Sequence, residues 1–257
     1  MKIIYGPVSS WRLGRSLGVD LICSKEKICS FDCIYCQLGK PWKKTSQRNN
    51  FVSIKKFEKE LLNALKVTNS DVITFSGMGE PTLAKNMDLA IKKIRKISNL
   101  PLAVLTNSSL MNLEDVRITL SKLDIVVAKL DSHNEEIFQR INQPADNINF
   151  KETIDGIKKF KKIFTGKLAL QIMFIHDNMQ YAADIAKLTS SIEPDEVQIN
   201  TPLRTCSIQP LTEKQIKHLE EEFKSKRLNI ISVYSSKKPK TTPLDKMELI
   251  KRRRTEV

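Results

Sequence analysis

Hydrophobic and polar residues follow one another in blocks along the chain, with short apolar runs rich in β-branched residues alternating with longer amphipathic segments. Short continuous apolar runs are typical of strands buried on both faces, and apolar residues three or four positions apart are typical of helices that bury one side. We therefore predict six strands, at 17–23, 71–76, 102–106, 124–130, 168–175 and 196–201. A predicted helix follows each of them, at 54–65, 83–97, 112–123, 150–164, 181–192 and 212–225.

This order of elements predicts the fold class. Successive strand–helix units form a parallel sheet covered by helices, and right-handed crossovers curl the sheet toward a barrel. A closed barrel of this kind needs about eight units, so six predict an α/β fold with an open, partial (β/α)6 barrel. A further apolar run at 229–235 is a candidate seventh strand. We place the barrel domain at 1–228 and a basic C-terminal extension at 229–257.

Two helix starts carry the sequence signature of a capping box, in which the first side chain accepts a hydrogen bond from a backbone amide three residues later. Asn112 with Asp115 is the first, and Thr212 with Gln215 is the second. Both support the predicted helix positions.

Charge changes the picture at the C-terminal end. The chain has 43 Lys and Arg against 29 Asp and Glu, a net charge of +14, and from Lys224 onward eleven basic residues accompany only three acidic ones. Such a surplus attracts polyanions, and KKPK at 237–240 and KRRR at 251–254 are patches of the kind that contact nucleic acid. A basic tail that is merely solvated is the alternative interpretation.

The chain has no apolar run near the roughly 20 residues that span a bilayer, and its N-terminal segment lacks the hydrophobic stretch of a secretory signal. We therefore expect a cytoplasmic protein with no membrane partner. Thiols stay reduced in that compartment, so the five cysteines indicate metal binding or catalysis rather than a disulfide framework.

Three of those cysteines, Cys29, Cys33 and Cys36, lie in the long irregular segment 24–53 after the first predicted strand. Chemistry in parallel α/β folds gathers at the C-terminal ends of strands, which places the trio on the functional face. A structural zinc site needs four ligands, and the chain offers only three histidines to complete one. A cubane iron–sulfur cluster held by three thiolates leaves one iron open to another ligand.

The C-x3-C-x2-C spacing, with the aromatic Tyr35 before the last cysteine, resembles the radical S-adenosylmethionine (SAM) superfamily. The resemblance implies a [4Fe-4S] cluster held by Cys29, Cys33 and Cys36, with SAM on the open iron and Tyr35 at the cofactor site. It implies reductive cleavage of SAM to methionine and a 5′-deoxyadenosyl radical. It also implies sensitivity to oxygen and a flavodoxin- or ferredoxin-like one-electron reductant as partner.

The segment FSGMGEPTL at 75–83 resembles the glycine-glycine-glutamate-proline element of that superfamily, with Met78 at a position where relatives have glycine. The resemblance implies that Gly77, Met78, Gly79 and Glu80 receive the ammonium group of SAM. Independently, glycines allow the backbone to approach a ligand closely. The alternative is an ordinary strand-to-helix turn.

Two further strand ends carry polar residues. In TNSS at 106–109 the resemblance implies that Asn107 reaches the cofactor, and the alternative is a turn in which Asn107 bonds its own backbone. In AKLDS, Lys129 and Asp131 share one face of the fourth strand. The resemblance implies that Lys129 and Asp131 contact SAM, with Lys129 on its carboxylate. The alternative is an ion pair between neighbours.

Polar residues also interrupt the last two apolar strands, at Gln171, Gln198 and Asn200. Buried amides need hydrogen-bond partners, which either a ligand or a neighbouring strand can provide. Asn200 is the member of this set that we take as a substrate candidate.

The other substrate candidates are Arg12, Arg204 and Cys206. Arg204 follows the sixth strand and Arg12 precedes the first, and a guanidinium holds phosphate or carboxylate in a bidentate manner. Cys206 is a candidate for quenching a radical or binding substrate, although a lone loop cysteine is more often inert.

The opening residues, FSGMGEPTL and VQINTPLR together resemble a compact radical SAM subgroup grouped with wyosine-forming tRNA enzymes, over about residues 5–205. Wyosine synthases carry a second cluster, and Cys23 with Cys206 cannot supply its ligands. Two functions remain open: a radical SAM enzyme acting on tRNA, RNA or another anionic substrate, or one acting on a small molecule, peptide or protein. A non-catalytic zinc or iron–sulfur module is the third alternative.

Overall fold

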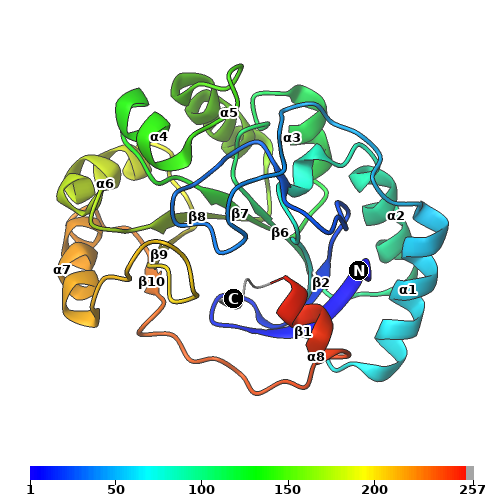
Figure 1. Cartoon of the computed structure of the whole chain (residues 1–257). Helices are drawn as coiled ribbons and strands as arrows, with labels where there is room; N and C mark the ends of the chain where they lie inside the picture. The colour runs from blue at the N-terminus through cyan, green and yellow to red at the C-terminus, as the bar shows by residue number, and fades with distance from the viewer. Residues whose placement is uncertain (253–257) are drawn as a thin grey trace.

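The computed structural model describes residues 1–252. Its main sheet has eight strands in the order β1-β2-β5-β6-β7-β8-β9-β10 (Figure 1). They are β1 (Ile4–Ser10), β2 (Gly14–Val19), β5 (Val72–Phe75), β6 (Leu102–Thr106), β7 (Ile125–Lys129), β8 (Lys167–Met173), β9 (Glu196–Asn200) and β10 (Ile230–Ser232). Only β1 runs antiparallel to its neighbour. Two short strands, β3 (Ile28–Cys29) and β4 (Lys43–Lys44), pair separately.

Helices cover the outer face of this curled sheet, which is open on one side (Figure 1). They are α1 (Ile54–Val67), α2 (Met87–Ile97), α3 (Glu114–Leu120), α4 (Glu135–Asn142), α5 (Phe150–Ile163), α6 (Ala182–Ser190) and α7 (Glu213–Lys224). A further helix, α8 (Lys246–Lys251), lies beside β1 instead. Two single 3-10 turns, η1 (Pro81–Leu83) and η2 (Met179–Tyr181), precede α2 and α6.

The predicted α/β partial barrel is confirmed. All six predicted strand–helix units are present, and β10 confirms the candidate seventh strand, parallel to β9. The strand β1 and the helices α4 and α8 were not predicted. The capping box at Thr212 is present, with Gln215 as its reciprocal partner. The capping prediction at Asn112 is wrong, because α3 begins at Glu114 and Leu113 precedes it without a side-chain cap. Asn112 instead donates to Glu152.

The two faces of the sheet differ in chemistry. Leu17, Ile73, Val104 and Leu170 point toward the helices and belong to one large apolar cluster. The opposite face, which lines the inside of the half-barrel, carries polar side chains, such as Ser16 hydrogen-bonded to Thr74 at 2.7 Å. A closed barrel of this size fills its interior with apolar side chains. The polar interior here leaves hydrogen-bonding groups facing the inside of the fold.

The C-terminal extension packs on the barrel in the part that the structure describes. Beyond β10 the chain runs along the open side of the half-barrel and ends in α8 beside β1 (Figure 1). The domain boundary after residue 228 remains a prediction. Within residues 1–252, no helix combines the length and the apolar character that a membrane span requires.

Candidate active site

The cysteine loop, defined as residues 28–39, follows β2 and lies between the segment after β5 and helix α4. The amide of Ile28 donates to Met78 O at 3.0 Å, and the amide of Ile34 donates to Ile141 O at 3.0 Å. Turn hydrogen bonds close the loop internally, such as Cys36 N to Cys33 O at 3.0 Å. Backbone contacts with distant segments therefore hold the three cysteines in place.

Each part of the loop has a polar neighbour suited to a thiolate. Asn107 Nδ2 lies 3.6 Å from Cys29 Sγ, and Asn142 Nδ2 lies 3.5 Å from Cys33 Sγ. Lys27 is buried, and although burial opposes its charge, the neighbouring Cys36, Cys29 and Cys33 raise its pKa. Lys27 Nζ donates to Gly39 O at 2.9 Å, so a buried cation lies against the cysteine loop.

This environment fits a thiolate-bound cluster. Amide donors and a buried cation stabilise negative sulfur, and they tune iron–sulfur clusters in general. Burial raises the pKa of Cys29 to about 12, and a metal that binds sulfur favours the thiolate form. Within residues 1–252, no three His, Cys, Asp or Glu side chains are grouped to hold a single metal ion. A cubane does not need such convergence, because each cysteine binds a different iron.

The glycine–glutamate loop, residues 76–80, lies directly against the cysteine loop. Gly79 has φ 152°, and a Cβ there would lie 1.6 Å from Ile28 O. Gly77 has φ 155°, and a Cβ there would lie 2.1 Å from Asp20 Cγ. The two glycines therefore do allow a close approach of the backbone, but the neighbours are Ile28 and Asp20 of the protein. Met78, between them, is buried and its carbonyl accepts from Ile28.

Glu80 joins this loop to the end of β6. Its Oε1 accepts from Thr82 N at 3.0 Å, Thr82 Oγ1 at 2.7 Å and Thr106 Oγ1 at 2.6 Å, and Oε2 accepts from Asn107 N at 2.7 Å. Burial raises the pKa of Glu80, and these donors oppose the rise. Glu80 also caps η1, so the strand-to-helix turn is present as well. Within residues 1–252, Oε2 accepts a hydrogen bond from one donor. It can accept another, for example from an ammonium group.

Asn107 connects Glu80 to the cysteine loop. Its Oδ1 accepts from Ser109 N at 3.0 Å, which is the turn considered as the alternative interpretation. Its Nδ2 donates to Ser30 Oγ at 2.8 Å and faces Cys29. Ser108 has φ 72°, a left-handed conformation that favours glycine. Asn107 therefore fixes the relative position of the two loops.

Lys129 and Asp131 form the ion pair considered as the alternative, with Nζ 3.7 Å from Oδ2. Lys129 Nζ also lies 3.2 Å from Gln171 Oε1 and 5.0 Å from the centre of the Tyr35 ring. Lysine over an aromatic face is favourable. This lysine therefore lies beside the cysteine loop and inside the half-barrel.

Asp131 has several protein partners. Its carboxylate accepts from Asn142 Nδ2 at 2.9 Å, from Met173 N at 2.8 Å and from the Tyr35 hydroxyl. Tyr35 is buried, and burial raises its pKa well above the ordinary value. In this arrangement Asp131 and Tyr35 hold the cysteine loop on β7 and α4.

A row of polar side chains crosses three strands on the inner face. Register places Lys129 beside Gln171 and Gln171 beside Gln198. Gln198 Nε2 donates to Glu196 Oε1 at 2.9 Å. In the part of the chain that the structure describes, Gln171 Nε2 and Gln198 Oε1 are buried without hydrogen-bond partners. Buried amide atoms normally have partners, so these two mark a place where a ligand can bind.

The substrate candidates Arg12 and Arg204 lie in the turn before β2 and in the segment after β9. Burial and the nearby Arg204 lower the pKa of Arg12 to about 10. Arg12 lies 5.1 Å from the Trp11 ring centre, and its buried Nε finds no hydrogen-bond partner within residues 1–252. Arg204 Nη1 donates to Gln37 Oε1 at 2.9 Å, which places it on the cysteine loop.

The remaining two candidates are less engaged. Asn200 ends β9, and its carbonyl accepts from Phe174 N at 2.7 Å. Cys206 Sγ lies 3.3 Å from Ile208 O, and the neighbouring Ser207 Oγ donates to Ile34 O at 2.8 Å. The segment after β9 therefore packs directly on the cysteine loop.

Residues 27–189 match the sequence model of the Radical SAM superfamily. Fold and site together define a radical SAM enzyme, a class whose cofactors are a [4Fe-4S] cluster and SAM. A UPF0026 protein of Synechocystis sp. is 41% identical over 80% of this chain and 77% of its own length. A UPF0026 protein of Methanocaldococcus jannaschii is 35% identical over 90% of this chain and 72% of its own length. The chain belongs to the radical SAM superfamily and to the UPF0026 family.

A Brachyspira hyodysenteriae protein named GTPase Obg is 34% identical over 97% of this chain, which spans 38% of that protein's length. The sequence here has no GxxxxGKS or GxxxxGKT phosphate loop. Solved structures share the fold. SuiB of Streptococcus suis bound to precursor peptide SuiA has a TM-score of 0.66 at 14% identity, over 86% of this chain and 49% of that one. A radical SAM methyltransferase from Sphaerobacter thermophilus has a TM-score of 0.64 at 13% identity, over 84% of this chain and 65% of that one.

Three residues of the site were not found from the sequence: Lys27, Asp20 and Asn142. Lys27 stands two positions before Cys29, which is a usable signal. Asp20 and Asn142 carry no local signal, because their partners lie far away in the sequence. Asp20 contacts Met78, and Asn142 contacts Cys33.

Proposed function

We propose that Cys29, Cys33 and Cys36 hold a [4Fe-4S] cluster and that the chain uses it to cleave SAM reductively. The observation that carries the proposal is the three-cysteine loop packed against a glutamate with one free acceptor position. When bound and reduced by an external donor, the cluster supplies one electron that breaks the C5′–S bond of SAM, giving methionine and a 5′-deoxyadenosyl radical. A flavodoxin- or ferredoxin-like protein is the proposed donor.

The roles of the other residues follow from their positions. Glu80 Oε2, beside Gly77–Gly79, receives the SAM ammonium group, and Asn107 holds that carboxylate next to the cysteine loop. Lys129 faces the inside of the half-barrel and is suited to the SAM carboxylate. Tyr35 and Asp131 act indirectly, because their polar groups bond each other.

We further propose that the substrate is RNA, tRNA in particular, or another anionic molecule. Arg12 and Arg204 support this, because a guanidinium group is suited to hold phosphate or carboxylate in a bidentate manner. Lys237, Lys238 and Lys240 are exposed and add positive surface beyond the open side. A small molecule, peptide or protein substrate is the second candidate.

The test is SAM cleavage by protein reconstituted with iron and sulfide without oxygen. With dithionite and SAM, the wild type is expected to form 5′-deoxyadenosine. Cys29→Ala, Cys33→Ala and Cys36→Ala are each expected to lose iron, because a cluster held by two thiolates is poorly retained. The cleavage rate is expected to fall at least about 100-fold, since changes to groups outside the ligand shell already cost up to about 100-fold. Cys206→Ala is the matched control and is expected to keep its iron. Tightly bound zinc without cleavage would instead support the non-catalytic module.

A further inference from the structure

The basic C-terminal segment has a second role that its charge alone does not indicate. We propose that Arg252, at the end of α8, is a positioning residue for the glycine–glutamate loop and acts on it through Asp20. The part of this inference that concerns SAM depends on the proposed function, whereas the mechanical coupling does not.

Asp20 is the link between the barrel and the loop. It follows β2, is 1% exposed, and accepts from Cys23 N at 2.8 Å and Ile22 N at 3.1 Å through Oδ1. Its Oδ2 accepts from Met78 N at 3.2 Å. Gly77 packs so closely on this carboxyl group that no side chain fits there. The position of the loop therefore depends on the position of Asp20.

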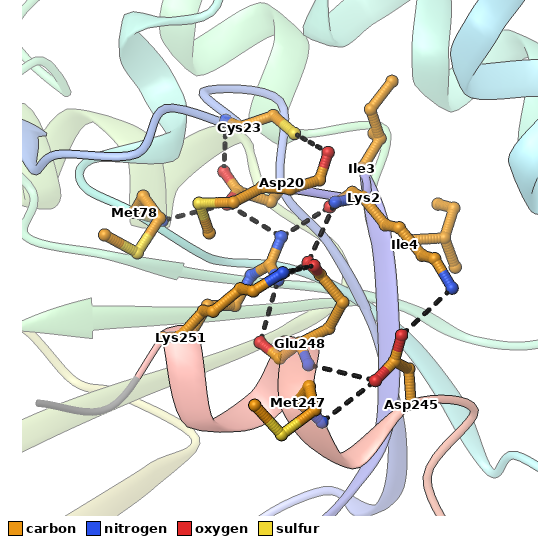
Figure 2. A network of polar contacts seen from close by, with 12 residues as sticks. Lys2, Ile3, Ile4, Asp20, Cys23, Met78, Asp245, Met247, Glu248 and Lys251 are labelled. Atoms are coloured by element: carbon orange, nitrogen blue, oxygen red, sulfur yellow. Dashed lines mark hydrogen bonds and ion pairs between the residues drawn. The ribbon is translucent and has the colours of Figure 1, made fainter. Parts of the chain in front are cut away.

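Arg252 reaches Asp20 from the other end of the chain. Figure 2 shows Asp20 next to Cys23 and Met78, with Glu248 of α8 close by. Its Nη2 lies 3.4 Å from Asp20 Oδ2 and donates to Lys2 O, and its Nη1 lies 2.9 Å from Glu248 Oε2. The guanidinium stacks 4.3 Å from the ring centre of Tyr5. At 5% exposed, Arg252 is an internal cation.

Removing one partner of a buried ion pair leaves the other charge uncompensated, which is strongly unfavourable. Burial raises the pKa of Asp20, and Arg252 is among the groups that oppose the rise. Without Arg252, we expect the Asp20 carboxylate to move toward solvent or to take up a proton. Either change weakens its hydrogen bond to Met78 N and loosens the loop.

If Arg252 only stabilised α8, the effect of removing its side chain would be confined to that helix. Glu248 already connects this helix to the barrel, because its Oε2 accepts from Lys2 N at 2.9 Å. Lys251 lies on the same helix, bonds Glu248 at 3.0 Å and leaves its side chain 54% exposed. Lys251 is therefore a matched control that shares the helix and the carboxylate but not the contact with Asp20.

Amide hydrogen exchange of the protein without cofactors tests the coupling. Arg252→Ala is expected to speed exchange in peptides covering residues 76–80 at least about tenfold, below the roughly 100-fold or more that a broken buried ion pair can cost, with peptides covering β6 unchanged. Arg252→Lys is expected to give an intermediate rate and Lys251→Ala the wild-type rate. In an Asp20→Asn background, Arg252→Ala is expected to add little. Faster exchange confined to residues 246–252 would overturn the proposal.

SAM affinity of the reconstituted protein tests the consequence. Arg252→Ala is expected to raise the Kd of SAM on the order of tenfold, a typical coupling between linked sites, with Lys251→Ala unchanged. An unchanged Kd with a loosened loop would overturn the claim that Arg252 positions the SAM site. If the wild type binds no SAM, the proposed function fails, and hydrogen exchange still decides the coupling.

Discussion

At the residue scale, the site depends on polar side chains that hold other polar side chains. Asn142 is the clearest example, since one amide nitrogen lies 2.9 Å from Asp131 Oδ2, 3.3 Å from the Tyr35 hydroxyl and 3.5 Å from Cys33 Sγ. Buried networks of this kind are rigid when every member is satisfied. The orientation of the cysteine loop thus depends on Asn142, which stands 109 positions after Cys33 in the sequence.

Asn142→Ala is expected to lower the free energy of unfolding by about 1–3 kcal/mol, because it removes a buried donor that Asp131 and Cys33 share. It is also expected to reduce iron retention after reconstitution, because Cys33 loses its amide neighbour. Denaturant unfolding and iron analysis measure the two effects. Asn112→Ala, which removes only a contact with Glu152 at the surface, is the control and is expected to change stability by less than about 0.5 kcal/mol. Equal stability of the two variants would contradict the role given to Asn142.

The sequence identifies site residues that belong to short motifs and misses those that do not. The cysteines and Glu80 stand in motifs whose spacing is itself informative. Arg252 shows the opposite case. KRRR at 251–254 predicts a surface patch, and for Arg252 this prediction is wrong, because Asp20, Glu248 and Tyr5 surround it. Arg253 and Arg254 lie outside the described residues.

At the element scale, periodicity predicts the long helices and fails for the helix α8. The helix α5 has 14 residues with an apolar face, whereas α8 has only six. Helices this short are not stable alone and depend on tertiary contacts. Asp245 caps α8 by accepting from Met247 N at 2.9 Å, and Arg252 with Glu248 anchors it (Figure 2). Those contacts join residues almost the whole chain apart, so local patterns do not reveal them.

At the scale of the whole molecule, the half-barrel combines a polar interior with an excess of positive charge. Within residues 1–252, the interior polar row includes Gln171 Nε2 and Gln198 Oε1, which are buried without hydrogen-bond partners, and Arg204 contacts Gln37 of the cysteine loop. The exposed lysines 237, 238 and 240 belong to the segment that runs along the open side. Together they favour a polyanion that approaches from the open side.

Binding to bulk tRNA over a salt series tests this charge argument. The affinity is expected to fall steeply with salt, by roughly 0.7–0.9 in log–log slope for each phosphate contact. Replacing Lys237, Lys238 and Lys240 by Gln is expected to reduce the steepness of the slope by the contribution of about two to three phosphate contacts. The control replaces Lys158, Lys159 and Lys162 by Gln; these lie on α5 on the outer face, and the slope is expected to stay as in the wild type. No retention of tRNA at low salt would contradict an RNA substrate and support a small one.

The central claim is that three cysteines hold the cluster and leave one iron for SAM. Electron–nuclear double resonance of the reduced, reconstituted protein measures this directly, with SAM labelled by 15N in the amino group and 17O in the carboxylate. We predict hyperfine coupling of both labels to the cluster, which means that both groups bind iron. Bound SAM without coupling, or a fourth protein ligand on the cluster, would contradict the account.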